Sequence, residues 1–326
     1  MRQLVQRAAF CGLLLALLAP GSTQDAAPRF EDLAQHFDYD REDPADLKQY
    51  GADERGGVWI YEVSYLSLRG GRVPATVVAP RGKGPFPAIL WGHWMMPGSP
   101  LRNRKEFLDE AELLARSGAV SLLIDAPLVR PGVVEDPDPM STQPIYATQQ
   151  AVVDFRRGLD VLLERYKADP QRIAYVGHSF NAHAGAILVA VDKRITAAVL
   201  MAGGYADEEY VFTSGDPKML TIRERYGDDK VRQFLRKFEW DDPVYFLSHS
   251  SPAHVFLQFG NQDPPLNGDL ARHYFKRFGE PKNLGFYDAG HALNAQARRE
   301  RVDFLVQQLK LRPVDPRALE KIPELK

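Results

Sequence analysis

The sequence is poor in cysteine, and the single one, Cys11, lies in an apolar N-terminal segment. The rest of the 326 residues therefore offers no thiol for a disulfide, a cysteine nucleophile or a thiolate metal site. A chain of this length buries about three quarters of its unfolded surface and holds a core without such cross-links. Small disulfide-stapled scaffolds are excluded.

The sequence also lacks an excess of charge of one sign and a second long apolar run. It has 41 Lys and Arg against 43 Asp and Glu, and its most basic stretch, residues 102–105, is followed directly by Glu106. Binding to nucleic acid needs clustered positive charge, so we expect no nucleic-acid partner. A spanning helix needs about 20 apolar residues, so we expect no membrane span.

The N-terminal segment predicts a removable leader. Arg2 and Arg7 precede an apolar stretch of twelve residues, Ala8 to Ala19, and small residues follow at 19–21. This order is typical of a secretory signal peptide. We expect residues 1–21 to be this peptide, with cleavage between positions 21 and 27, and the mature protein to be secreted or periplasmic. An apolar N-terminus that stays in the cytoplasm is the alternative.

The rest of the chain alternates apolar runs with segments of helical periodicity. Two β-rich runs joined by Gly70 and Gly71 predict a hairpin at 58–79. Further strands are expected at 88–91, 119–124, 172–176, 195–201, 254–259 and 284–287, and helices at 105–116, 148–166, 182–191, 270–278 and 293–309. We predict an α/β fold with a doubly wound, mostly parallel sheet of about eight strands and helices on both faces.

The same pattern predicts a single domain over residues 58–312. A polar arm at 22–57, with one short helix near Phe30, precedes the domain, and a tail at 313–326 follows it. Two stretches interrupt the alternation: 126–147, rich in Pro and Asp, and 205–247, in which we expect two helices. We expect both insertions to cover one edge of the sheet.

A strand, a sharp turn and a helix of small residues meet at Ser179. The turn reads Gly177-His178-Ser179-Phe180-Asn181. A serine at its apex exposes its hydroxyl above the sheet, where the first N–H groups of the helix point at a reacting oxygen. The pattern resembles the nucleophile elbow of the α/β-hydrolase family, with Asn181 in place of the last glycine. A plain strand-to-helix turn containing a serine is the alternative.

Serine becomes a strong nucleophile when a histidine, oriented by a carboxylate, takes its proton. Asp263 follows the run at 254–259, and His291 follows the run at 284–287. Because parallel strands end at one edge of a sheet, we expect Ser179, Asp263 and His291 to converge there as a catalytic triad. The other carboxylates of this region are read as turn residues: Asp241, Asp242, Asp269 and Asp288.

From Tyr61 to about Leu309 the sequence is similar to the α/β-hydrolase branch of dienelactone hydrolases, acetyl-xylan esterases and prolyl-oligopeptidase-like peptidases. The resemblance implies Ser179 as nucleophile, His291 as general base and then acid, and Asp263 as its orienting carboxylate. It also implies two backbone N–H donors for the oxyanion, for which we expect Phe180 and Trp94, with Met95 as the alternative to Trp94. Dienelactone hydrolases have cysteine where this chain has Ser179.

We expect four further side chains at the substrate pocket: Met95, Met96, His178 and Asn181. No metal-binding motif of the His-Glu-x-x-His type is present, so we expect neither a metal ion nor a cofactor. The favoured function is a secreted serine hydrolase acting on a small-molecule or carbohydrate-linked carboxylic ester. An amide or peptide hydrolase and a catalytically silent binding protein of the same fold are the alternatives.

Overall fold

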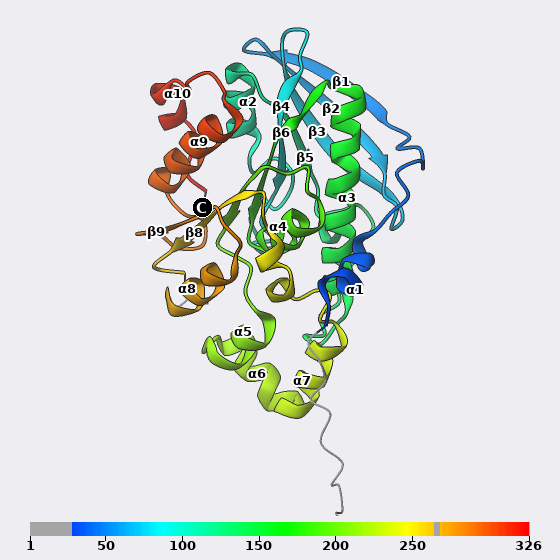
Figure 1. Ribbon diagram of the computed structural model, residues 1–326, viewed down its shortest axis with the longest axis vertical. Coiled ribbons are helices and arrows are strands. Elements are labelled where there is room, and N and C mark those ends of the chain that lie inside the picture. The colour runs from blue at the N-terminus through cyan, green and yellow to red at the C-terminus, as the bar shows by residue number, and fades with distance from the viewer. Residues whose placement is uncertain (1–27, 264–267, 326) are drawn as a thin grey trace, which may run out of the picture.

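The computed structural model describes residues 28–263 and 268–325, so the predicted leader lies outside the described residues. A central sheet has helices on both sides, and a group of three helices extends beyond one end of it (Figure 1). These three are α5 (Asp207–Thr213), α6 (Pro217–Tyr226) and α7 (Asp228–Lys237). They belong to the predicted insertion at 205–247.

The described residues form one nine-stranded sheet in the order β1-β2-β3-β5-β4-β6-β7-β8-β9. The first three strands and β5 pair antiparallel, whereas β5, β4 and β6 to β9 run parallel to one another. The strands are β1 (Lys48–Arg55), β2 (Val58–Leu66), β3 (Arg72–Pro80), β4 (Phe86–Gly92), β5 (Val120–Ile124), β6 (Ala168–His178), β7 (Ala197–Met201), β8 (His254–Gly260) and β9 (Lys282–Tyr287). The predicted doubly wound, mostly parallel sheet is confirmed.

Each face of the sheet buries its own core. One face packs against α3 (Gln143–Arg165), α4 (Phe180–Val191) and α8 (Gly268–Arg277). The other packs against α2 (Leu108–Ser117), α9 (Ala295–Leu309) and α10 (Pro316–Glu320). Because successive side chains of a strand point to opposite faces, Tyr175 of β6 lies in the first core and Val176 in the second. The buried parts of the central strands are mostly apolar for this reason.

The predicted arm contains more structure than expected. Its short helix is present as α1 (Phe30–Ala34) and a 3-10 turn, η1 (Gln35–Phe37), and the side chain of Phe37 is fully buried in the first core. The arm also contributes β1, which was not predicted and brings the sheet from the expected eight strands to nine. Nearly all of β1 is exposed on both faces, so it lacks the apolar alternation by which a strand is detected.

The two insertions are largely irregular or helical. The first contains a 3-10 turn, η2 (Pro127–Val129), and the start of α3. The second has three α-helices where two were expected, followed by the 3-10 turns η3 (Pro243–Tyr245) and η4 (Leu247–His249). Every helix in the described ranges is too short or too polar to cross a membrane.

Candidate active site

Ser179 occupies a strained turn between β6 and α4. Its backbone has φ 56° and ψ −115°, a conformation that costs a non-glycine residue free energy and is typical of functional sites. The N–H of Ser179 donates to the carbonyl of Met201 at 2.8 Å. The turn packs so closely that a Cβ on Gly177 would lie 2.2 Å from the carbonyl oxygen of Asn181, and one on Gly203 would lie 2.3 Å from that of Ser179. Glycine is required at both positions.

A histidine and a carboxylate lie at the ends of the neighbouring strands. Asp263 follows β8 and is 3% exposed, and His291 follows β9. Nδ1 of His291 lies 2.8 Å from Oδ2 of Asp263. A carboxylate only accepts, so the ring donates from Nδ1 and its Nε2 keeps a lone pair. The predicted partnership of these two residues is present in the structure.

Ser179 and His291 line the same cavity, whose volume is about 460 Å³. Among the described residues, no hydrogen bond joins the Ser179 hydroxyl to the imidazole of His291. Serine hydrolases without substrate often have a long contact at this point, which shortens when substrate binds. Side chains of the 205–247 insertion form much of the remaining wall, including Tyr205, Asp207 and Met219.

Solved structures of esterases have the same architecture. No protein-family model matches the sequence, and no curated protein matches it. The acetyl xylan esterase from Paenibacillus sp. R4 superimposes with a TM-score of 0.67 at 20% identity, over 86% of this chain and 92% of that one. Acetyl xylan esterase 1 from Thermoanaerobacterium sp. JW/SL YS485 gives a TM-score of 0.67 at 13% identity, over 85% and 92% of the two chains. The chain has the α/β-hydrolase fold.

A third structure extends this comparison. A cold-adapted esterase from an Arctic intertidal metagenomic library matches with a TM-score of 0.55 at 19% identity, over 80% of this chain and 99% of that one. The predicted resemblance to the α/β-hydrolase family is therefore confirmed at the level of the fold. Within this α/β-hydrolase fold, the turn of Ser179 and the ends of β8 and β9 occupy the edge at which such sheets bind ligands.

The prediction that the backbone N–H of Trp94 donates to the oxyanion is wrong. Its N–H donates to Oε2 of Glu106 at 2.5 Å, so it is not available to a substrate oxygen. The N–H groups of Phe180, which begins α4, and of Met95 have no hydrogen-bond partner within the described ranges. Phe180, which lines the cavity, therefore stays a candidate donor, and Met95, the alternative to Trp94, is left as the candidate for the second although it does not line the cavity.

None of the four expected pocket residues lines the cavity, and two of them, His178 and Asn181, are buried in the core. His178 is 0% exposed: its Nδ1 lies 2.6 Å from Oε1 of Glu106, and its Nε2 lies 2.8 Å from the carbonyl oxygen of His291. Asn181 is 1% exposed and donates to the carbonyl of His93 at 2.6 Å. Both residues fix loops around the site. Met95 and Met96 are half-buried and do not contribute to the cavity wall.

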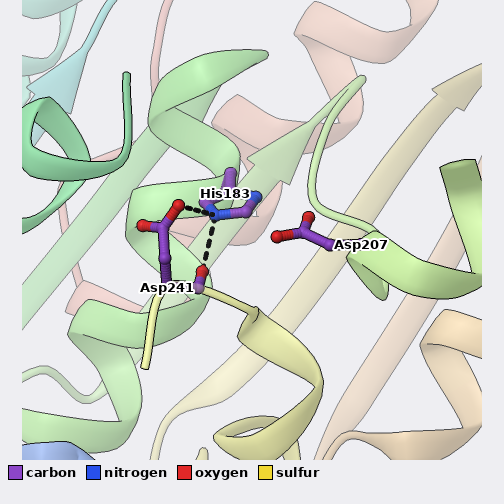
Figure 2. Close-up of side chains that lie close together, drawn as sticks. All are labelled: His183, Asp207 and Asp241. Carbon is purple, nitrogen blue, oxygen red and sulfur yellow. Dashed lines mark hydrogen bonds and ion pairs between the residues drawn. The ribbon is translucent and has the colours of Figure 1, made fainter. Parts of the chain in front are cut away.

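The structure adds a cluster that the sequence did not predict. His183, Asp207 and Asp241 line the cavity, and Nε2 of His183 lies 2.8 Å from the carbonyl oxygen of Asp241 (Figure 2). The three come from distant parts of the chain and form no motif. The one available indication was the position of His183 four residues after Ser179, which places it on the same side of α4.

The cluster has perturbed acid–base properties. Burial raises the pKa of Asp207 to about 7. Burial and the negative charge of Asp207 raise the pKa of Asp242 to about 8, and the same two causes raise the pKa of Asp241. Burial lowers the pKa of His183 and so favours its neutral imidazole. Such shifts are concentrated at functional sites.

Proposed function

We propose that the protein is a secreted serine hydrolase that cleaves carboxylic esters through an acyl-enzyme. The observation that carries the proposal is the 2.8 Å contact between His291 and Asp263 at the wall of the cavity that Ser179 also lines. This arrangement supplies a nucleophile, a base with a free lone pair and a carboxylate that fixes the tautomer of the base. The expected leader supports secretion.

In the proposed reaction, Nε2 of His291 takes the hydroxyl proton of Ser179 as the serine oxygen attacks the ester carbonyl carbon. Asp263 stabilises the resulting imidazolium. The N–H of Phe180, which lines the cavity, donates to the oxyanion of the tetrahedral intermediate, and the unpaired N–H of Met95 is the candidate for the second donor. His291 then protonates the leaving alcohol, and a water molecule activated by the same histidine hydrolyses the acyl-enzyme and regenerates the Ser179 hydroxyl.

We propose a small-molecule or carbohydrate-linked ester as substrate. The cavity of about 460 Å³ has room for a short acyl group and part of an alcohol, and aromatic side chains such as Tyr205 and Tyr210 form part of its wall. Two of the similar structures are acetyl xylan esterases. A short acyl ester on a carbohydrate is therefore the first substrate class to test.

Hydrolysis of p-nitrophenyl acetate and labelling with a fluorophosphonate test the proposal. We expect labelling at Ser179 and turnover of the ester, and we expect Ser179→Ala to lower kcat by up to about a millionfold. The exposed Ser248 provides a control, because Ser248→Ala should leave both readouts unchanged. A Ser179→Ala protein that retains a tenth of the activity would contradict the proposal.

The same assays separate the alternative functions. Faster turnover of aminoacyl-nitroanilides than of p-nitrophenyl esters would make the protein an amide hydrolase. A folded protein that does not react with the fluorophosphonate would be a silent binding protein. N-terminal sequencing of the exported protein tests secretion, and we expect it to begin within residues 22–28.

A further inference from the structure

Three side chains that the proposed acyl transfer does not use converge on one wall of the cavity. His183 comes from α4, Asp207 is the first residue of α5, and Asp241 follows α7. One ligand atom from each lies within 4.8 Å of the others. The imidazole of His183 lies between the two carboxylates, with Asp241 on one side and Asp207 on the other (Figure 2).

One carboxylate of the cluster has an oxygen that no donor satisfies. Nε2 of His183 lies 2.8 Å from the carbonyl oxygen of Asp241 and 3.9 Å from Oδ2 of the Asp241 carboxylate. In the described part of the chain, no group donates to Oδ1 of Asp241, and Asp241 is only 7% exposed. Buried acceptors without a partner are costly, which indicates that a ligand normally satisfies them.

The charge of the cluster indicates the sign of that ligand. Asp242 lies beside it, since its Oδ2 accepts the N–H of Asp207 at 3.0 Å. Of the ion pairs between described residues, none joins Asp207, Asp241 or Asp242 to a lysine or arginine. Lys218 lines the same cavity but does not pair with these carboxylates. Buried carboxylates without such a partner are neutralised by protonation or by binding a cation, so the ligand that this cluster suits is a cation.

We propose that His183, Asp207 and Asp241 form a binding site for one Zn²⁺ ion. One imidazole nitrogen and two carboxylate oxygens are a common zinc ligand set, whereas Ca²⁺ takes six to eight oxygens. Tetrahedral bonds of about 2.1 Å separate ligand atoms by about 3.4 Å, so small side-chain rotations close the cluster around the ion.

The proposed ion has a definite structural effect. It joins α4, which follows the nucleophile, to the beginning of α5 and to the segment after α7. It therefore fixes the 205–247 insertion against the sheet and shapes the cavity wall. The three protein ligands leave the fourth coordination position of Zn²⁺ open to water or to a substrate oxygen. None of the three belongs to the proposed triad, so the site does not depend on the proposed function.

Metal binding is tested on protein carrying Ser179→Ala, so that the result is independent of esterase activity. After treatment with a chelator, equilibrium dialysis against Zn²⁺ should give one ion per chain, and Co²⁺ should give the visible absorption of a low-coordinate site. At a Zn²⁺ concentration 100 times the Kd, the Tm should rise by about 5 °C. A failed esterase assay would leave these readouts unaffected.

Single substitutions test which side chains bind the proposed Zn²⁺ ion. His183→Gln, Asp207→Asn and Asp241→Asn should each lose the bound zinc and the Tm rise, with circular dichroism confirming that they fold. The matched controls His273→Gln and Asp269→Asn, at exposed positions, should retain both. If a ligand variant does not fold, the Co²⁺ spectrum of the parent protein decides. Absence of saturable Zn²⁺ and Co²⁺ binding, unchanged binding in the variants, or a preference for Ca²⁺ or Mg²⁺ would overturn the proposal.

Discussion

Nδ1 of His178 lies 2.6 Å from Oε1 of Glu106, and both side chains are fully buried. The other oxygen of Glu106 accepts the N–H of Trp94, and the other nitrogen of His178 faces the carbonyl of His291. This chain of contacts connects the loop after β4 to the loop that carries His291. The geometry of the proposed active site therefore depends on two residues that do not contact the cavity.

Replacing this carboxylate should affect both stability and activity. We expect Glu106→Gln to lower the free energy of unfolding by about 3–5 kcal/mol, because removing one partner of a buried pair leaves the other without compensation. We also expect kcat on p-nitrophenyl acetate to fall, since both loops lose a fixed contact. Urea denaturation and steady-state kinetics measure the two effects. Glu135→Gln, at an exposed carboxylate, is the control and should change neither.

Asp263→Asn tests the orienting carboxylate. The buried amide would no longer select the tautomer of His291 that leaves a lone pair on Nε2, so we expect kcat to fall by about 10⁴-fold. The variant should fold normally, because Asn has nearly the same shape. Asp288→Asn, at an exposed residue near His291, should retain activity within a few fold. If Asp288→Asn caused the larger loss, the assignment of Asp263 would be wrong.

The pH dependence of stability should report on His93. This side chain is 1% exposed; its Nδ1 lies 2.6 Å from the carbonyl oxygen of Trp94, and its Nε2 accepts the N–H of Ala126 at 2.9 Å. Burial lowers the pKa of His93 below its ordinary value of 6.5. The folded protein thus binds this proton more weakly than the unfolded chain does. The stability that the neutral ring contributes is complete above about pH 6.5 and is lost as the pH falls below that value.

We expect His93→Gln to reduce the loss of unfolding free energy between pH 7 and pH 5. One proton accounts for at most about 1.4 kcal/mol per pH unit, so the two proteins should differ by less than this slope. Urea denaturation at a series of pH values measures the difference. His273→Gln, at an exposed histidine, should keep the parent slope. Parallel curves for the parent and His93→Gln would show that His93 has no part in the acid sensitivity.

Because the turn at Ser179 is closely packed, we expect a single added methyl group there to lower the stability of the protein strongly. A Cβ at residue 177 would lie 2.2 Å from the carbonyl oxygen of Asn181, so we expect Gly177→Ala to destabilise the protein by more than about 4 kcal/mol. Gly51→Ala is the matched control, because nothing lies within 4 Å of a Cβ there and we expect a change within about 0.5 kcal/mol. Thermal or urea unfolding of both variants measures the contrast.

The central sheet was predictable because its strands are buried on both faces. Strands such as β7 and β8, and the second half of β6, consist mostly of buried apolar residues, and the polar residues directly after β8 and β9 could be assigned to one edge. The strand ends therefore led to Asp263 and His291. β1 could not be found in the same way, because its side chains face solvent and carry no burial pattern.

The parts of the site that were not predicted depend on contacts between distant segments. Nothing near Trp94 in the sequence shows that Glu106 would accept its N–H. The burial of His178 likewise depends on its contacts with Glu106 and with the loop of His291, which are distant in the sequence. The cluster of His183, Asp207 and Asp241 forms only when the 205–247 insertion folds back onto α4, and no local spacing encodes that step.

The outermost strand has a consequence for behaviour at high protein concentration. β1 ends the sheet and presents an open row of backbone hydrogen-bonding groups to solvent, a surface on which strands of other molecules can add. It is exposed and largely polar on both faces, and it carries Lys48, Asp53, Glu54 and Arg55. A second copy pairing there would have to desolvate these charges. The polar and charged side chains that made β1 difficult to predict therefore oppose aggregation through this edge.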